Sequence, residues 1–162
     1  MRINEEPGDR GSAEDLVLRR LVGEVWVDVY RFGGMGVVDF GEMISWPLGD
    51  SGEVSTGSGF AVHAQCPFRI VRHGKVLLGS DDLVRVQGGG DRLRYDRGAD
   101  ALREFLSREA PRVLSVDRAP EGDLRITLDH GIRIDVLPTG SEEESWRFLV
   151  RCGEHVTFPP TD

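Results

Sequence analysis

The feature that most constrains the fold is a pair of alternating segments between residues 123 and 137. Apolar residues occupy every second position of both segments, namely Leu124, Ile126, Leu128, Ile132, Ile134 and Val136. A period of two is that of a β-strand with one buried face. The segments lie too close together for anything but an antiparallel connection, so they predict a β-hairpin.

The loop of this hairpin follows from the same pattern. A two-residue loop would set Leu128 against Arg133 and mix the two faces, because a slip of one residue turns every side chain over. A three-residue loop at 129–131 sets Leu128 against Ile132 and keeps the apolar face intact. Gly131 would then take the positive φ of a bulged turn.

Two helices are expected, one N-terminal and one connecting. The first runs from about 13 to 22, with Ser12 as its cap and Gly23 after its end. The second lies near residues 98–109 and stops before Pro111. Its apolar stripe consists of Leu102, Phe105 and Leu106. We expect this stripe to cover the hairpin's apolar face, since two strands alone cannot bury that face in water.

Further short strands are predicted along the chain. They lie at 24–32, 37–40, 60–65, 68–72, 75–79, 113–116, 146–150 and 155–158. Pro67 marks a bend between two of them. The glycine-rich segment 41–59 is expected to be a long loop, and 72–74 a three-residue turn that sets Ile70 opposite Val76. These elements predict a single α+β domain at 12–158 that follows a disordered polar tail at 1–11.

The two halves of the chain resemble each other in the order of these segments. Residues 29–31 (Val, Tyr, Arg) precede a glycine turn, two strands and the aromatic-Arg-apolar strand at 68–70. Residues 116–118 (Val, Asp, Arg) precede a glycine turn, two strands and a similar strand at 146–148. This order predicts two duplicated, antiparallel sheet halves, although short alternating strands can also resemble one another by chance.

Charge and composition exclude several classes of protein. A net charge of -8 and a pI near 5.0 disfavour nucleic-acid binding, which draws on clustered Lys and Arg. No apolar run approaches the about 20 residues of a membrane span. The N-terminus carries Glu5, Glu6 and Asp9 in place of a signal peptide. We therefore expect a cytoplasmic protein with no membrane and no nucleic-acid partner, whose Cys66 and Cys152 stay reduced.

Two spacings resemble metal-ligand pairs: His63 with Cys66, and Cys152 with His155. Together they would supply the four ligands of a Cys2His2 zinc site. Residues three apart on a strand point to opposite faces, however, so the alternative is buried thiols with ordinary histidines. The chain has no nucleophile elbow, phosphate-binding loop or His-Glu-x-x-His helix. It therefore names no catalytic residue, no metal ligand set and no cofactor.

Several polar residues are candidates for contact with a partner. Asp81 and Asp82 follow a strand and could bind a cation, pair with an arginine or cap a turn. Ser141 and Glu144 form a capping box, which predicts one acidic helical turn at 142–144. Arg69 could pair with an acid within the sheet or contact a ligand. The candidate partner-binding residues are His63, Arg69, Asp81, Asp82, Glu142, Glu143 and Glu144.

Three stretches of the chain, 63–70, 79–83 and 145–149, resemble a group of small uncharacterised actinobacterial proteins. The order Leu-Val-Gly at 21–23, an alternating strand and then Phe-Gly at 40–41 is similar to that group and to immunity-type proteins encoded near polymorphic toxins. Such proteins commonly have Trp after the Cys-Pro pair, where this chain has Phe68. The resemblance implies a small α+β protein that acts by binding, and it supplies no catalytic residues.

These observations favour a non-enzymatic, acidic protein-binding module, similar to an immunity protein or antitoxin. An acidic surface steers basic partners, such as a basic toxin, toward it. The alternative is an enzyme or metal-binding domain that gathers His63, Cys66, Asp81 and Asp82 around one cleft.

Overall fold

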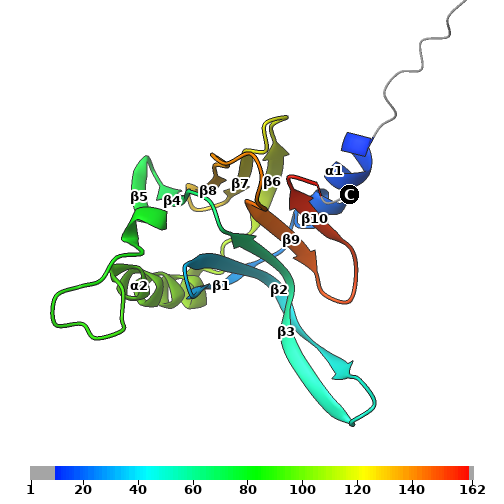
Figure 1. The fold of residues 1–162 in the computed structure, drawn as a ribbon, viewed down its shortest axis with the longest axis horizontal. Helices are drawn as coiled ribbons and strands as arrows, with labels where there is room; N and C mark the ends of the chain where they lie inside the picture. The colour runs from blue at the N-terminus through cyan, green and yellow to red at the C-terminus, as the bar shows by residue number, and fades with distance from the viewer. Residues whose placement is uncertain (1–9, 161–162) are drawn as a thin grey trace, which may run out of the picture.

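The chain folds as two similar halves, each a helix followed by five strands (Figure 1). The computed structural model describes residues 10–160. The first half contains α1 (Arg10–Arg19), β1 (Trp26–Phe32), β2 (Met35–Leu48), β3 (Glu53–Ala64), β4 (Phe68–Arg72), β5 (Lys75–Gly79) and the 3-10 turn η1 (Ser80–Asp82). The second half contains α2 (Arg94–Glu109), β6 (Val113–Arg118), β7 (Leu124–Leu128), β8 (Ile132–Val136), β9 (Trp146–Val150) and β10 (His155–Phe158).

The two halves exchange their last two strands. The first sheet has the order β1-β2-β3-β9-β10 and the second has the order β5-β4-β8-β7-β6, with antiparallel pairing throughout. Each sheet therefore combines the three-stranded meander of one half with the hairpin of the other. The predicted α+β class and the duplicated sheet halves are confirmed. Because β4 pairs with β8 and β9 with β3, each half needs the other to complete its sheet.

The first strands of the two halves share a β-bulge that the sequence pattern does not reveal. Strict alternation predicts that Val27 and Val29 share a face, but Val29 is buried beside Trp26 while Val27 is exposed. The pairing register shifts by one residue at this point, and the same shift in β6 exposes Leu114. An extra residue in one strand reverses the side-chain direction locally, which here turns Trp26 into the core.

The hairpin at 123–137 has the predicted register. Leu124 lies opposite Val136 and Ile126 opposite Ile134, with a loop at 129–131. Gly131 has a φ of 71°, as a bulged turn requires. All six apolar residues of the predicted face are at most 2% exposed.

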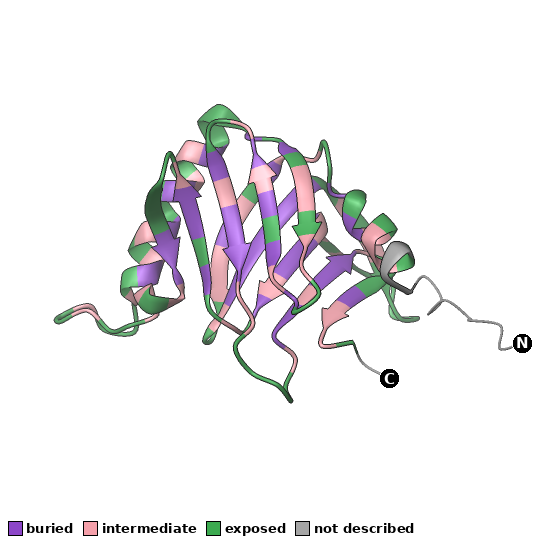
Figure 2. Cartoon of the chain, turned by 90° about the horizontal axis from the view of Figure 1, so that it is seen from above, coloured by how far each residue is buried: buried purple, intermediate pink, exposed green. Residues whose placement is uncertain are grey.

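The prediction that α2 covers this apolar face is wrong. α2 lies mainly along β1, β5 and η1, and the hairpin's face shares one core with Trp26, Phe40 and Phe148 of the other sheet. A five-stranded face is wider than one helix can cover, so a second sheet packs over it. Figure 2 shows buried residues alternating with less buried ones along the strands, as packing of one face requires.

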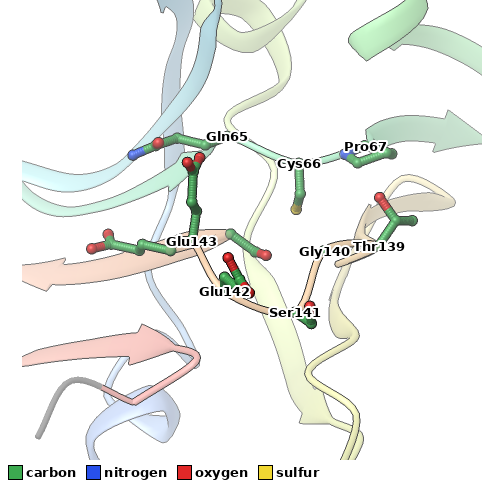
Figure 3. Close-up of a pocket in the computed structure, with 10 residues that line it drawn as sticks. Gln65, Cys66, Pro67, Thr139, Gly140, Ser141, Glu142 and Glu143 are labelled. Carbon is green, nitrogen blue, oxygen red and sulfur yellow. The ribbon is translucent and has the colours of Figure 1, made fainter.

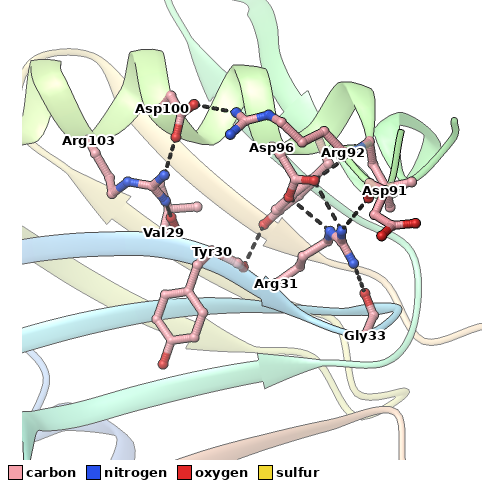
Figure 4. A network of polar contacts seen from close by, with 11 residues as sticks. Val29, Tyr30, Arg31, Gly33, Asp91, Arg92, Asp96, Asp100 and Arg103 are labelled. Atoms are coloured by element: carbon pink, nitrogen blue, oxygen red, sulfur yellow. Dashed lines mark hydrogen bonds and ion pairs between the residues drawn. The ribbon is translucent and has the colours of Figure 1, made fainter. Parts of the chain in front are cut away.

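The helices instead close the two sides of the space between the sheets. α2 contacts edge strands of both sheets, β1 and β5, and α1 likewise contacts β10 and β6. Arg31 of β1 binds Asp96 of α2 at 2.8 Å (Figure 4), and Arg118 at the equivalent end of β6 binds Glu14 and Asp15 of α1. Each half's first strand is thus fastened to the other half's helix.

The helix boundaries differ from those predicted. α2 begins at Arg94 rather than near 98, because the Asp96 carboxylate accepts a hydrogen bond from the Leu93 amide at 2.7 Å and caps the first turn. α1 begins at Arg10 and so includes the last two residues of the expected tail, whose first nine residues lie outside the described part of the chain. Neither helix is long and apolar enough to cross a membrane.

The β4–β5 turn also differs from the sequence expectation. It contains two residues, His73 and Gly74, with φ values of 48° and 78°, instead of the predicted three. This turn sets Val71 opposite Val76, and a β-bulge next to it then sets Ile70 opposite Leu78 and not opposite Val76. Two left-handed residues in a two-residue turn match the twist of the strands that they join, which the three-residue interpretation overlooked.

Candidate functional site

The segment 41–59, expected to be a long loop, is instead the outer part of the β2–β3 hairpin, which we call the arm (Figure 1). β1 pairs with β2 only as far as Phe40, and β9 pairs with β3 only as far as Phe60. Beyond these positions, apart from single backbone hydrogen bonds at Gly41 and Gly59, β2 and β3 pair only with each other, so the arm projects from the two packed sheets. Backbone pairing needs no apolar alternation, which is why the pattern of this segment does not predict strands.

The arm carries exposed apolar side chains beside acidic ones. Met43, Leu48 and Val54 are 67%, 47% and 62% exposed. The charged residues of the arm are Glu42, Asp50 and Glu53, all acidic. A two-stranded hairpin is only marginally stable alone in water, so side chains of this kind gain most when another surface covers them.

Arg151, which follows β9, holds the arm at its root. Its Nε donates a hydrogen bond to the Ser58 carbonyl at 3.2 Å, and its guanidinium lies 5.6 Å from the centre of the Trp46 ring. Gly57 permits this arrangement, because a Cβ there would lie 3.1 Å from the Trp46 ring. The root of the arm is therefore packed, while its outer part carries the exposed side chains.

A buried carboxylate lies near this anchor on the outer face of the first sheet. Asp39 of β2 is 7% exposed, and its Oδ1 accepts no hydrogen bond from the described residues. Burial raises the pKa of Asp39 to about 6, although the charge of Arg151 opposes this shift. Asp28, directly opposite on β1, raises the pKa further, and the Tyr30 hydroxyl lowers it. The result is two neighbouring carboxylates with one unsatisfied acceptor.

His63 of β3 lies on the same face, opposite Arg147 of β9. Burial lowers the pKa of His63, and the charges of Arg151 and Arg147 lower it further, while Glu144 raises it. His63 is therefore neutral at neutral pH. Of the residues singled out in the sequence, the structure brings His63 and Glu144 together here, beside the anchor of the arm.

The two crossovers between the sheets line an open pocket of about 450 Å³ (Figure 3). Residues 65–67 form one wall, where Pro67 marks the predicted bend, and residues 139–145 form the other. Burial raises the pKa of the Cys66 thiol to about 11, so it is not a nucleophile at neutral pH. The expected acidic helical turn at 142–144 is absent: the segment is a bend, and Glu144 instead binds Arg147 at 2.9 Å.

The remaining candidates lie elsewhere, and two of them, Asp82 and Arg69, have structural partners. One oxygen of Asp82 caps the turn η1, and the other binds Arg94 of α2 at 2.8 Å. Asp81 is exposed beside it. Arg69 binds Asp135 at 3.0 Å on the outer face of the second sheet. These are the turn-capping and ion-pairing roles that the sequence left open for Asp82 and Arg69.

Within residues 10–160, no group of three or more His, Cys, Asp or Glu residues is placed to hold a metal ion. His63 and His155 are close enough for their charges to interact, but Cys152 is exposed with a φ of 57°, and Cys66 lines the pocket. The four residues of the zinc interpretation therefore do not converge. Cys66 lines the pocket but His63, Asp81 and Asp82 do not, and Asp82 instead contacts α2 and η1.

The described residues thus form an α+β protein of two interlocked halves, with a projecting arm and a buried acid near its root. Comparison with known proteins finds no matching family model, no matching curated protein and no matching solved structure. The function is therefore argued from the arrangement of these residues.

Sequence reasoning missed both the arm and Asp39, although each had a signal. Asp39 interrupts the otherwise apolar strand 37–40. A carboxylate buried within such a strand costs free energy unless another group pairs with it. Segment 41–59 combines Trp46, apolar residues and acids without a single lysine or arginine. That composition is unlike an ordinary solvated loop, which mixes both charges.

Proposed function

We propose that this chain is a non-enzymatic protein-binding module of the immunity type, which binds a basic protein partner through its arm. The observation that carries the proposal is the arm itself, which projects from the sheets with exposed apolar and exclusively acidic side chains. Apolar contact would supply affinity, and the acids would select a basic surface.

The charge of the whole chain supports this assignment. A net charge of -8 attracts a basic partner at long range and raises the association rate in a salt-dependent manner. Glu142 and Glu143, exposed at the rim of the pocket, add to that field. We place the interaction in the cytoplasm, where Cys66 and Cys152 remain thiols.

The test is co-expression with the product of the neighbouring gene, read as rescue of growth and as co-purification. Val54→Ser removes an exposed apolar side chain of the arm, and Val76→Ser on β5, where the valine is 53% exposed, is its matched control. Glu53→Lys reverses an arm charge, and Asp81→Lys is its control at η1. We expect each arm variant to weaken binding by about tenfold.

Both controls should retain rescue and change the affinity by less than about twofold. Circular dichroism would confirm that all four variants fold. Rescue by the arm variants at the level of the unchanged protein, or an absence of any complex, would contradict the proposed function.

A further inference from the structure

We propose that Asp39 is the receptor for an arginine side chain of the basic partner, at the root of the arm. The inference rests on the proposed function and names the chemistry that the partner must bring. Its starting point is that Asp39 is more than nine-tenths buried, yet Oδ1 has no donor within the described chain. A buried acceptor without a donor costs free energy that a partner's donor would recover.

The equivalent positions in the second half show which side chains the first sheet lacks around Asp39. By strand register and the shared bulge, Asp39 is equivalent to Thr127, and Ala61 beside it is equivalent to Arg133. The first sheet therefore has an additional acid where the second has a neutral residue, and an alanine where the second has a guanidinium. With Asp28 opposite Asp39, this row carries two negative charges and no cation of its own.

Arg151 does not fill the gap. Its charge acts on Asp39, but its Nε donates to the Ser58 carbonyl and its guanidinium carbon lies over the Trp46 ring. None of its nitrogens donates to Oδ1 of Asp39. The charge of Arg151 offsets one of the two negative charges of Asp39 and Asp28, but Oδ1 of Asp39 still accepts no hydrogen bond within the described chain.

An arginine fits this place better than a lysine. Its planar guanidinium offers five donors in a fixed fork, so it can bind Asp39 and Asp28 together and lie against an aromatic ring. Tyr30 supplies such a ring: its side chain leaves β1 on the side away from α2 (Figure 4). Tyr30, Asp28 and Arg151 are all half-buried, so side-chain rotation can admit the guanidinium.

The test uses capped hexa-arginine and hexa-lysine peptides as probes, with binding measured by calorimetry near neutral pH. Asp39→Asn should weaken hexa-arginine binding by about tenfold. Asp81→Asn removes the same charge from an exposed position and should change it by less than about twofold. The unchanged protein should bind hexa-arginine more tightly than hexa-lysine. NMR titration of the Asp39 carboxyl carbon should show its pKa falling from about 6 when hexa-arginine is added.

Equal losses in the two Asn variants would show attraction by net charge alone and overturn the inference. So would an unchanged Asp39 titration, equal binding of both peptides, or no binding of hexa-arginine. Asp39→Asn should not prevent folding, because it removes a buried charge. If Asp39→Asn leaves rescue and affinity intact while Val54→Ser and Glu53→Lys weaken both, this inference fails and the proposed function stands. If the arm variants also rescue, the proposed function itself fails.

Discussion

Each half of the molecule places a buried carboxylate on the outer face of a sheet, and the two halves treat it differently. Asp135 is 2% exposed, and its oxygens accept hydrogen bonds at 3.0 to 3.1 Å from Arg69, Arg125 and Arg133. Burial alone would raise the pKa of Asp135, but these three guanidiniums lower it below the usual value. Asp39 is nearly as buried, keeps one oxygen without a donor, and has a pKa raised to about 6.

The difference shows that two halves of similar fold can have different roles. In the second half, Asp135 is fully paired, by Arg125 and Arg133 of the same half and by Arg69 of the other, and β7–β8 ends in a short loop, so this region contributes to stability. The first half extends the equivalent β2–β3 hairpin into the arm and leaves Oδ1 of Asp39, near the root of the arm, without a donor among the described residues. Sites that break local rules of pairing are the places where function is expected. This contrast supports our proposal that the first half binds the partner.

The largest expected loss of stability comes from truncating core residues on the inner faces of the two sheets, which should be equally well packed in both halves. Ile126→Ala should cost about 2 to 5 kcal/mol of unfolding free energy, because the residue is fully buried in the core. Val38→Ala, at the equivalent position on β2, should also cost more than about 1 kcal/mol. Thr127→Ala should cost less than about 1 kcal/mol. Urea unfolding measures all three, and equal losses at Ile126 and Thr127 would refute the face assignment.

Asp135→Ala should be the next largest loss. It leaves three arginines without their shared acceptor, and we expect a cost of about 2 kcal/mol, reduced from that of a fully buried pair because the arginines are 35% to 53% exposed. The measurement is urea unfolding at neutral pH. An unchanged midpoint would show that solvent already satisfies these groups and that the second half gains nothing from the network.

Asp39→Asn should raise the unfolding free energy at neutral pH, whereas Asp135→Ala lowers it. The folded pKa of about 6 exceeds the ordinary 3.8, so the folded chain holds a proton that the unfolded chain loses between these pH values. Stability of the unchanged protein should therefore fall as the pH rises from about 4 to 6. At neutral pH the variant should be more stable by about 1 to 3 kcal/mol, with the difference vanishing near pH 4. Unfolding curves across this range check the sign, and a destabilised variant would mean that Asp39 is paired.

The smallest expected effect compares the two hairpin loops. Gly131→Val places a β-branched residue at a φ of 71°, with a Cβ only 2.2 Å from the His73 ring, and should cost more than about 1 kcal/mol. Gly49→Val at the tip of the arm has a φ of 61° but meets nothing within 4 Å. It should cost less than Gly131→Val in thermal unfolding. A larger loss for Gly49→Val than for Gly131→Val would show that the tip of the arm contributes more to the unfolding free energy than the loop at 129–131.

Much of the fold could be predicted, because strands and helices leave local periodic signals. The hairpin at 123–137, the bend at Pro67 and the duplication all follow from residue order, and the structure confirms them. The candidate site was harder. His63 and Glu144 do lie beside the arm's anchor, but Arg69 and Asp82 serve structural pairs, and Asp39 was overlooked.

Outside segment 41–59, the sequence by itself determined which segments are strands, which are helices and which face of the 123–137 hairpin is apolar. These properties depend on neighbours a few residues away, so the alternation of side chains records them. Only the tertiary structure decided that a sheet and not α2 covers that face, that segment 41–59 pairs with itself as the arm, and that Asp135 meets three arginines while Oδ1 of Asp39 lacks a donor. Each of these outcomes depends on groups far apart in the chain, brought together by the exchange of hairpins between the halves, and no local pattern records that exchange.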